Sequence, residues 1–286
     1  MEIPFHKVSF SNQEIVAVNE VISSGWWTSG PKSIEFEKKF KSVVGSKFSL
    51  SVSSCTAALH LALKAIGVSK GDEVIIPTNT FVATIEAVSY LEATPILCDI
   101  NKTDHNIDTS KIEKLITDKT KVIIPVHFGG FPCDMDSISN IAKKYNLKVV
   151  EDAAHALPTY YKNKLVGSLS DITCFSFYAT KTLSTGEGGM ITTDNSDYYN
   201  SMKHNRIHGI SGDAWDRYSD KGKWFYNVVD QGYKYNMSDI SAALGLVQLD
   251  KLFKHNSLRL DIASRYMDKF DRYGIEYVKQ DSSNQS

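Results

Sequence analysis

The feature that most constrains the fold is a regular alternation of apolar, strand-like runs with helix-like runs through residues 47–152. Because the strand-like runs are apolar on both faces, they are typical of strands buried in a sheet that helices cover on both sides. Such alternation favours an α/β fold with a parallel or mixed sheet. The predicted strands are 47–54, 72–77, 94–100, 120–128 and 147–152, and the predicted helices are 56–68, 80–92, 109–117 and 134–146.

The pattern changes near Ser238. Two helix-like runs, 238–256 and 257–274, are followed by a strand-like run at 275–280. A helix pair with a single strand is a poor independent domain, because it lacks a core of its own. We therefore expect a large domain over residues 1–237, with the N-terminal segment, and a small α+β domain that begins in 238–286 and is incomplete in this chain.

Charge and cysteine content exclude several classes of protein. The chain has 32 basic and 33 acidic residues and a net charge of −1, which favours neither nucleic acid nor an anionic membrane as a partner. Cys55, Cys98, Cys133 and Cys174 lack the spacing of metal ligands or of a disulfide framework. We expect reduced thiols, no metal and a cytoplasmic location. The sequence shows neither a signal peptide nor an apolar run of membrane-spanning length.

Candidate functional residues follow three strand-like runs, at the positions where open α/β sheets bind ligands. Asp152 ends one run and His155 lies three residues later; a helix cap beside a polar histidine is the alternative. Thr56 lies where a serine-rich segment enters a helix, so it is a candidate for binding phosphate or for an ordinary N-cap. Ser176 and Lys181 follow the third run.

Together these features fit the requirements of pyridoxal 5′-phosphate (PLP). This cofactor needs a lysine for covalent attachment, a carboxylate opposite its pyridine nitrogen and a cradle for its phosphate. A lysine with an ordinary pKa of about 10.4 is a poor nucleophile at neutral pH, and burial beside a cationic ring would favour its neutral form. Each feature is weak alone, and their order and placement at strand ends make the combination specific.

Motifs along nearly the whole chain resemble those of the DegT-type nucleotide-sugar aminotransferases. They include SSCTAALHLAL, GDEVIIPTNTFVATIEAV, EDAAHALPTYYKNKLVGS, FSFYATKTLSTGEGGMITT and GYKYNMSDISAALGLVQL. The variants TYYK, VHFGG and GYKYN are most similar to the branch of UDP-4-amino-4-deoxy-L-arabinose–oxoglutarate aminotransferase. The resemblance implies fold type I of the PLP-dependent transferases, with a mostly parallel central sheet between helices and a small C-terminal α+β domain.

The resemblance assigns roles around the cofactor ring. Lys181 matches the lysine that holds PLP covalently and moves a proton during the reaction. Asp152 matches the carboxylate partner of the pyridine nitrogen, and His155 matches a residue near the phenolic oxygen. Phe81 matches the aromatic side chain that stacks on the ring, with a core phenylalanine as the alternative.

Phosphate contacts are implied for a second group of residues. Cys55 and Thr56 match the pair that cradles the phosphate, and Ser176 matches a further phosphate contact. In the family a second subunit completes the active site. Lys234 and Asn236, in GYKYN, are both candidates for the residue that reaches the phosphate of the partner, which implies a homodimer with shared active sites.

Substrate contacts are implied for Arg206, His208 and Tyr178. Arg206 and His208, in NRIHG, are candidates for contact with the sugar nucleotide, and a solvated or helix-terminal position is their alternative. Tyr178 occupies a position that is often histidine in relatives, so substrate selection is expected to differ.

The resemblance therefore implies an aminotransferase that moves an amino group from glutamate to a 4-keto-sugar of a nucleoside diphosphate sugar. Two alternatives stay open. A deoxysugar dehydratase uses the same scaffold with histidine in place of the anchoring lysine, whereas this chain has Lys181. A cofactor- or sugar-binding protein without turnover is the reading favoured by an incomplete C-terminal domain.

Overall fold

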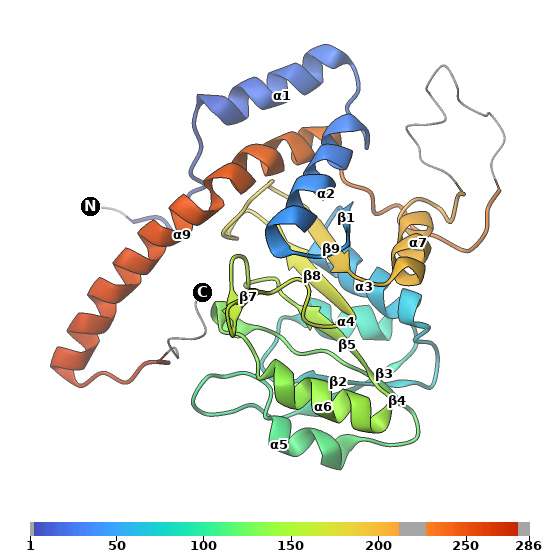
Figure 1. The fold of residues 1–286 in the computed structure, drawn as a ribbon, viewed down its shortest axis with the longest axis vertical. Coiled ribbons are helices and arrows are strands. Elements are labelled where there is room, and N and C mark those ends of the chain that lie inside the picture. Colours follow the sequence, from blue (N-terminus) through green and yellow to red (C-terminus); the bar gives the residue numbers. More distant parts are fainter. Residues whose placement is uncertain (1–2, 212–226, 280–286) are drawn as a thin grey trace.

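A computed structural model of the chain describes residues 3–211 and 227–279. At its centre lies a seven-stranded sheet in the order β1-β9-β8-β5-β4-β2-β3. β9 is antiparallel to both of its neighbours, and the other adjacent pairs are parallel, which confirms the mostly parallel sheet. The strands are β1 (Phe48–Val52), β2 (Glu73–Pro77), β3 (Thr94–Cys98), β4 (Thr120–Ile123), β5 (Lys148–Asp152), β8 (Ile172–Ser176) and β9 (Gly189–Thr193), with a separate hairpin of β6 (Tyr160–Tyr161) and β7 (Lys164–Leu165) (Figure 1).

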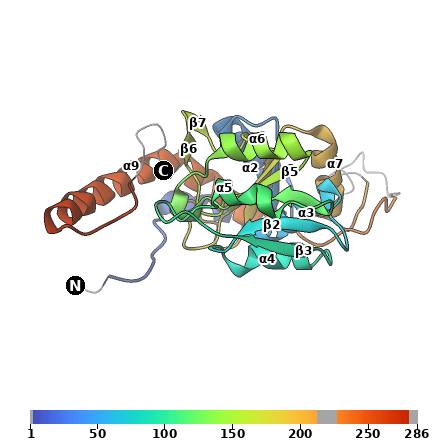
Figure 2. The same cartoon turned by 90° about the horizontal axis from the view of Figure 1, so that it is seen from below.

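Helices cover both faces of this sheet (Figures 1 and 2). One apolar cluster packs α3, α4 and α7 against one face of the sheet. On the opposite face, a second cluster contains α2 and α9, and a third contains α5 and α6. No helix among the described residues is long and apolar enough to span a membrane. The helices are α1 (Asn12–Ser24), α2 (Pro31–Val44), α3 (Cys55–Ile66), α4 (Val82–Ser89), α5 (Thr109–Ile112), α6 (Met135–Tyr145), α7 (Ser196–Asn205) and α9 (Asp239–Tyr273), with short 3-10 turns at Glu113–Leu115 and Phe128–Gly130.

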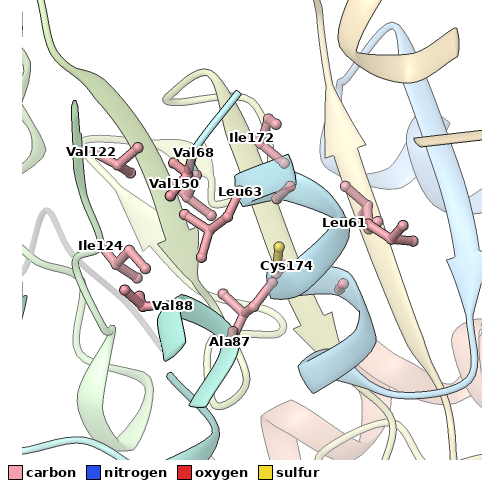
Figure 3. Packing of buried hydrophobic residues seen from close by; sticks show 14 of the residues in the cluster. Leu61, Leu63, Val68, Ala87, Val88, Val122, Ile124, Val150, Ile172 and Cys174 are labelled. Atoms are coloured by element: carbon pink, nitrogen blue, oxygen red, sulfur yellow. The ribbon is translucent and has the colours of Figure 1, made fainter. Parts of the chain in front are cut away.

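The apolar strands of the sequence are explained by burial on both sides. Successive side chains of a strand point to opposite faces of the sheet. Val122 and Val150 pack with Leu63 of α3 on one face, as Figure 3 shows. Their neighbours Ile123 and Val149 belong to the cluster on the other face. At these positions of β4 and β5 neither face is left to solvent, which explains their apolar residues.

Three predicted elements are shorter than expected. The helix expected at 80–92 is α4, which begins one residue after Phe81, because Phe81 has an extended backbone at the N-cap. The strand expected at 120–128 is β4, which ends before Pro125; Pro cannot donate a ladder hydrogen bond. The helix expected at 109–117 is one turn of α5 followed by a 3-10 turn.

The prediction of two helices after Ser238 is wrong, because α9 is one continuous helix of 35 residues. Asn256 and Ser257, at the expected break, are compatible with a helix interior. Of the strand expected at 275–280, the described part, 275–279, forms no strand, and Gln280 lies outside the described residues. The buried side chains of α9 end at Leu252, beyond which the helix extends away from the sheet (Figure 1). The division into domains at residue 238 stays a prediction.

A buried carboxylate attaches the start of α9 to the start of α2. Asp239 accepts hydrogen bonds from the backbone amides of Gly30, Lys32 and Ser33 at 2.8, 3.0 and 2.9 Å. The hydroxyl of Ser33 donates a fourth, at 2.6 Å. These amides belong to the first turn of α2 and have no acceptor within that helix. The carboxylate therefore supplies acceptors to a helix terminus whose amides would otherwise lack them.

Candidate active site

Eight of the predicted site residues line one cavity of about 750 Å³. The cavity lies beyond the carboxyl ends of β1, β5 and β8, where open α/β sheets bind ligands. Residues distant in the sequence meet there because the parallel strands end at the same edge. The eight residues are Cys55, Thr56, Phe81, Asp152, His155, Ser176, Tyr178 and Lys181.

Asp152 is the last residue of β5, and its carboxylate is buried. The hydroxyl of Thr84 in α4 donates to Oδ2 at 2.8 Å, and the amide of Ala154 donates to Oδ1 at 3.1 Å. The two donors bond different oxygens and so hold the carboxylate in one orientation. Asp152 can thus accept a hydrogen bond from a cationic ring in the cavity.

Lys181 lies on the loop that follows β8. Its amide donates to the carbonyl of Tyr178 at 2.9 Å, which closes a tight turn and directs the chain back toward β9. The lysine is half-buried, and this burial lowers its pKa below the ordinary value, although Asp152 acts in the opposite direction. A lowered pKa increases the fraction of neutral amine, which is the nucleophilic form.

The N-terminus of α3 forms a cradle of backbone amides beside Lys181. Ser54 is the N-cap, and its hydroxyl accepts from the amide of Ala57 at 3.0 Å. The amides of Cys55 and Thr56 belong to the first turn, where N–H groups lack acceptors within the helix and attract anions. Burial raises the pKa of the Cys55 thiol, so the thiol stays protonated and does not repel a phosphate.

Gly189 permits the chain after Lys181 to approach this cradle closely. A Cβ atom at Gly189 would lie only 2.7–2.9 Å from the backbone of Ser54 and Cys55. Any side chain there would push β9 away from the start of α3. Glycine at this position therefore keeps the cradle and the lysine loop together.

His155 is held as one tautomer. The backbone amide of Gly129 donates to Nδ1 at 3.3 Å, so Nδ1 carries the lone pair. The exposed ring is partly desolvated by the cavity wall, which lowers the pKa of His155; the charge of Lys181 lowers it further and Asp152 opposes both, so the neutral ring is favoured at pH 7. The proton then lies on Nε2, which makes this nitrogen a donor for an anionic oxygen in the cavity.

Two aromatic residues lie at the mouth of the cavity. Phe81 has 75% of its surface exposed, so it is not a core phenylalanine. It precedes α4, the helix that carries Thr84, and lines the cavity. Tyr178 is 46% exposed and also lines the cavity. Both rings are thus exposed and belong to the wall of the cavity.

Arg206 does not line the cavity. Its guanidinium is mostly buried and pairs with Glu37 at 2.6 Å. The same nitrogen donates to the carbonyl of Ser51 in β1 at 2.8 Å. These contacts tie α2, β1 and the segment after α7 together, so in this chain Arg206 supports the fold.

The other three predicted residues also lie outside the cavity. His208 is exposed and has a positive φ of 60°. Lys234 is exposed, whereas Asn236 is half-buried and donates from Nδ2 to the hydroxyl of Ser29 at 2.9 Å. Lys234 and Asn236 belong to an extended segment that pairs with Ile207 and with Val52 at the end of β1.

Sequence reasoning missed several residues that build the site. Thr84, fully buried in α4, orients Asp152; a lone hydroxyl in the apolar run FVATIEAV was the available signal. Ser54 caps α3, and the two consecutive serines before Cys55 were the available signal. The contact of Gly189 with the cradle is long-range and left no local signal.

Helix α3 carries a second polar residue behind the cradle. His60 lies one turn after Thr56, is buried, and has an Nε2 without a hydrogen-bond partner among the described residues. Burial lowers the pKa of His60 from 6.5 to about 4, and the charge of Lys64 adds to the effect. The histidine is therefore neutral in the folded protein at neutral pH.

Folding stability is expected to fall between pH 7 and pH 4 because of His60. The unfolded chain binds a proton at this histidine below about pH 6.5, and the folded chain only below about pH 4, so acid favours unfolding. This difference corresponds to about 3 kcal/mol. Urea unfolding at pH 7 and at pH 4 checks this. Between these pH values the free energy of unfolding of His60→Gln should fall by about 3 kcal/mol less than that of the parent chain. Equal decreases in the two proteins would contradict the assignment.

The cavity fits PLP on its own chemistry. The cradle at α3 supplies amides for a phosphate. Gly189 has no side chain that would press against the backbone of Ser54 and Cys55 there. Asp152 supplies a fixed acceptor, and Lys181 supplies an amine whose pKa is lowered. With the α/β sheet of fold type I, this arrangement defines the class of protein as a PLP-dependent transferase.

Comparison with known proteins narrows this class. The chain belongs to the DegT/DnrJ/EryC1/StrS aminotransferase family, which it matches over residues 9–286. It is 47% identical to the spore coat polysaccharide biosynthesis protein SpsC of Bacillus subtilis, over 94% of this chain and 69% of SpsC.

Solved structures agree with this assignment. The PLP form of Spr1654 from Streptococcus pneumoniae, named as a sugar aminotransferase, is 36% identical with a TM-score of 0.87, over 95% of this chain and 72% of that chain. PseC of Helicobacter pylori, an aminotransferase involved in the biosynthesis of pseudoaminic acid, is 31% identical with a TM-score of 0.87, over 94% of this chain and 71% of that chain. The chain is accordingly a PLP-dependent sugar aminotransferase, and the predicted family, fold and cofactor are confirmed.

Proposed function

We propose that this enzyme transfers an amino group from glutamate to carbon 4 of a keto-sugar carried by a nucleoside diphosphate. The product would serve polysaccharide or other surface-glycan biosynthesis in the cytoplasm. The proposal is supported by the similarity to SpsC, a spore coat polysaccharide biosynthesis protein, and to PseC, an aminotransferase involved in the biosynthesis of pseudoaminic acid. The preference for carbon 4 rests on the branch that the sequence resembles.

The observation that carries the proposal is the convergence of Lys181 and Asp152 on one cavity. Lysine at the anchoring position favours amination, since the dehydratases of this scaffold have histidine there. When bound, PLP supplies an electron sink for the carbon that bears the transferred amino group. Asp152 would hold a proton at the pyridine nitrogen, and Lys181, released by substrate, would move a proton as a general base and acid.

The remaining cavity residues would bind and orient the cofactor. The amides of Cys55 and Thr56 would hold the phosphate, with Ser176 as a further donor. His155 would donate from Nε2 to the phenolic oxygen. Phe81 would cover one face of the ring and exclude water from it.

We further propose a homodimer whose partner subunit contributes to each site. Lys234 is the better candidate for this contact, because it is exposed while Asn236 is half-buried. An ammonium group would add a charge-assisted bond to a phosphate. The exposed Phe81 and Tyr178 at the cavity mouth are compatible with a covering subunit.

The purified enzyme with PLP, mixed with glutamate alone, tests the first half of the reaction. We expect the visible band of the bound cofactor to shift to that of the amine form. A panel of UDP- and dTDP-linked 4-keto- and 3-keto-sugars is then added. We expect the 4-keto compounds to restore the original visible band and the 3-keto compounds not to restore it. Bound cofactor without any shift would favour the binding protein without turnover, and release of water from a deoxysugar substrate would favour the dehydratase.

A further inference from the structure

The buried His60 of α3 does not line the cavity and lies in a cluster of tyrosines. The hydroxyl of Tyr235 is 3.1 Å from Nδ1 of His60. The rings of Tyr233 and Tyr235 stack at 5.1 Å with an angle of 12°, and the His60 ring is 4.6 Å from that of Tyr233. Both tyrosines pack against the main apolar cluster. The reaction proposed above uses none of these three side chains.

The tyrosines belong to the extended segment 233–236, in which side chains alternate between two sides. Tyr233 and Tyr235 contact α3, whereas Lys234 is exposed and Asn236 donates to Ser29. The side on which Lys234 emerges is thus set by the contact of the tyrosines with His60. A shift of one residue would exchange the two sides.

The same segment is joined to the phosphate cradle through its backbone. The carbonyl of Tyr235 accepts from the amide of Ser53 at 2.7 Å, one residue before the N-cap Ser54. The amide of Tyr235 donates to the carbonyl of Arg206 at 2.9 Å. Tyr235 therefore makes two contacts near the start of α3. Its carbonyl bonds Ser53 in the β1–α3 connection, and its hydroxyl bonds His60 within α3, one turn beyond Thr56.

We propose that His60 and Tyr235 are positioning residues for the phosphate cradle. Their hydrogen bond holds segment 233–236 in register against α3, and the bond from Ser53 to Tyr235 transmits this register to the amides of Cys55 and Thr56. Neither side chain lines the cavity, so both act through the backbone. The buried ring depends on this bond, because Nε2 of His60 has no partner within residues 3–211 and 227–279, and loss of the Tyr235 hydroxyl would remove the partner of Nδ1 as well.

Comparing PLP with pyridoxal, which lacks the phosphate, separates positioning of the cradle from general stability. Tyr235→Phe keeps both stacked rings and removes only the hydroxyl. We expect the Kd of PLP to rise roughly fivefold, as for the loss of one hydrogen bond, while the Kd of pyridoxal is unchanged. Titration of the apoenzyme with each compound, followed by absorbance, gives both constants without measuring turnover.

Two further variants make the test decisive. Tyr161→Phe removes a tyrosine hydroxyl that bonds Asp134 beside α6, away from the cavity, and should change neither Kd. The double variant His60→Phe/Tyr235→Phe should raise the Kd of PLP no more than the stronger single variant, because both remove the same bond. Equal weakening of PLP and pyridoxal in Tyr235→Phe, no weakening of either, or additive effects in the double variant would overturn the proposal.

Discussion

Replacing Lys181 with alanine should abolish the visible absorbance band of the bound cofactor and reduce kcat by at least about 10²- to 10⁴-fold. The reduction follows from loss of the group that transfers a proton, for which this range is typical. Covalent attachment is lost as well, so the cofactor should dialyse away more readily. Absorbance spectra before and after dialysis, with single-turnover rates with glutamate, measure both effects.

Matched variants test whether the effect belongs to this lysine. Lys181→Arg keeps a long cationic side chain in the cavity and cannot attach the cofactor, so it should behave like the alanine variant. Lys164→Ala removes an exposed lysine of β7 and should leave the spectrum and the rate unchanged. A visible band that survives in Lys181→Ala would show that another residue holds the cofactor.

Replacing Asp152 with asparagine should lower kcat by on the order of 10²- to 10³-fold, the cost of removing one group that stabilises charge in a reaction. Asparagine preserves the shape of the side chain, but its single oxygen can accept from only one of the two donors, Thr84 or Ala154, which bond different oxygens of Asp152. It carries no charge, however, and cannot keep a proton on the pyridine nitrogen. The Kd of PLP should change much less than kcat, because the phosphate cradle remains intact.

A variant of the supporting residue separates charge from orientation. Thr84→Val removes the hydroxyl that donates to Asp152 and keeps a similar volume, so it should lower kcat by a smaller factor than Asp152→Asn. The order of the three kcat values is the decisive measurement. Equal activity of Asp152→Asn and the parent enzyme would contradict the role of the carboxylate.

The predicted strands were found at nearly their expected positions, because strands buried on both faces are recognisable from local sequence. β9 was missed: it is a short antiparallel strand inserted between β1 and β8, and its place depends on pairing with segments far away in the chain. The division of residues 238–274 into two helices was wrong, because the interruption of the apolar pattern near Asn256 marks the end of burial and not the end of the helix.

The candidate site shows the same contrast. Asp152, Thr56 and Lys181 could be predicted, since each follows a strand and belongs to a motif. The placement of Arg206 could not, because its partner Glu37 lies in α2 and nothing near NRIHG indicates that contact. The half-burial of Lys181 also depends on segments distant in the sequence, and this burial lowers its pKa.

The sequence by itself determined the α/β class, the cofactor and most of the predicted residues that line the cavity, because these depend on local periodicity and on residue types at strand ends. Only the tertiary structure decided that Thr84 orients Asp152, that Gly189 lies against the cradle and that Tyr235 joins the cradle to His60. Each of these contacts connects segments separated by more than 60 residues. Such contacts arise from the packing of the whole sheet and its helices, which no local pattern encodes.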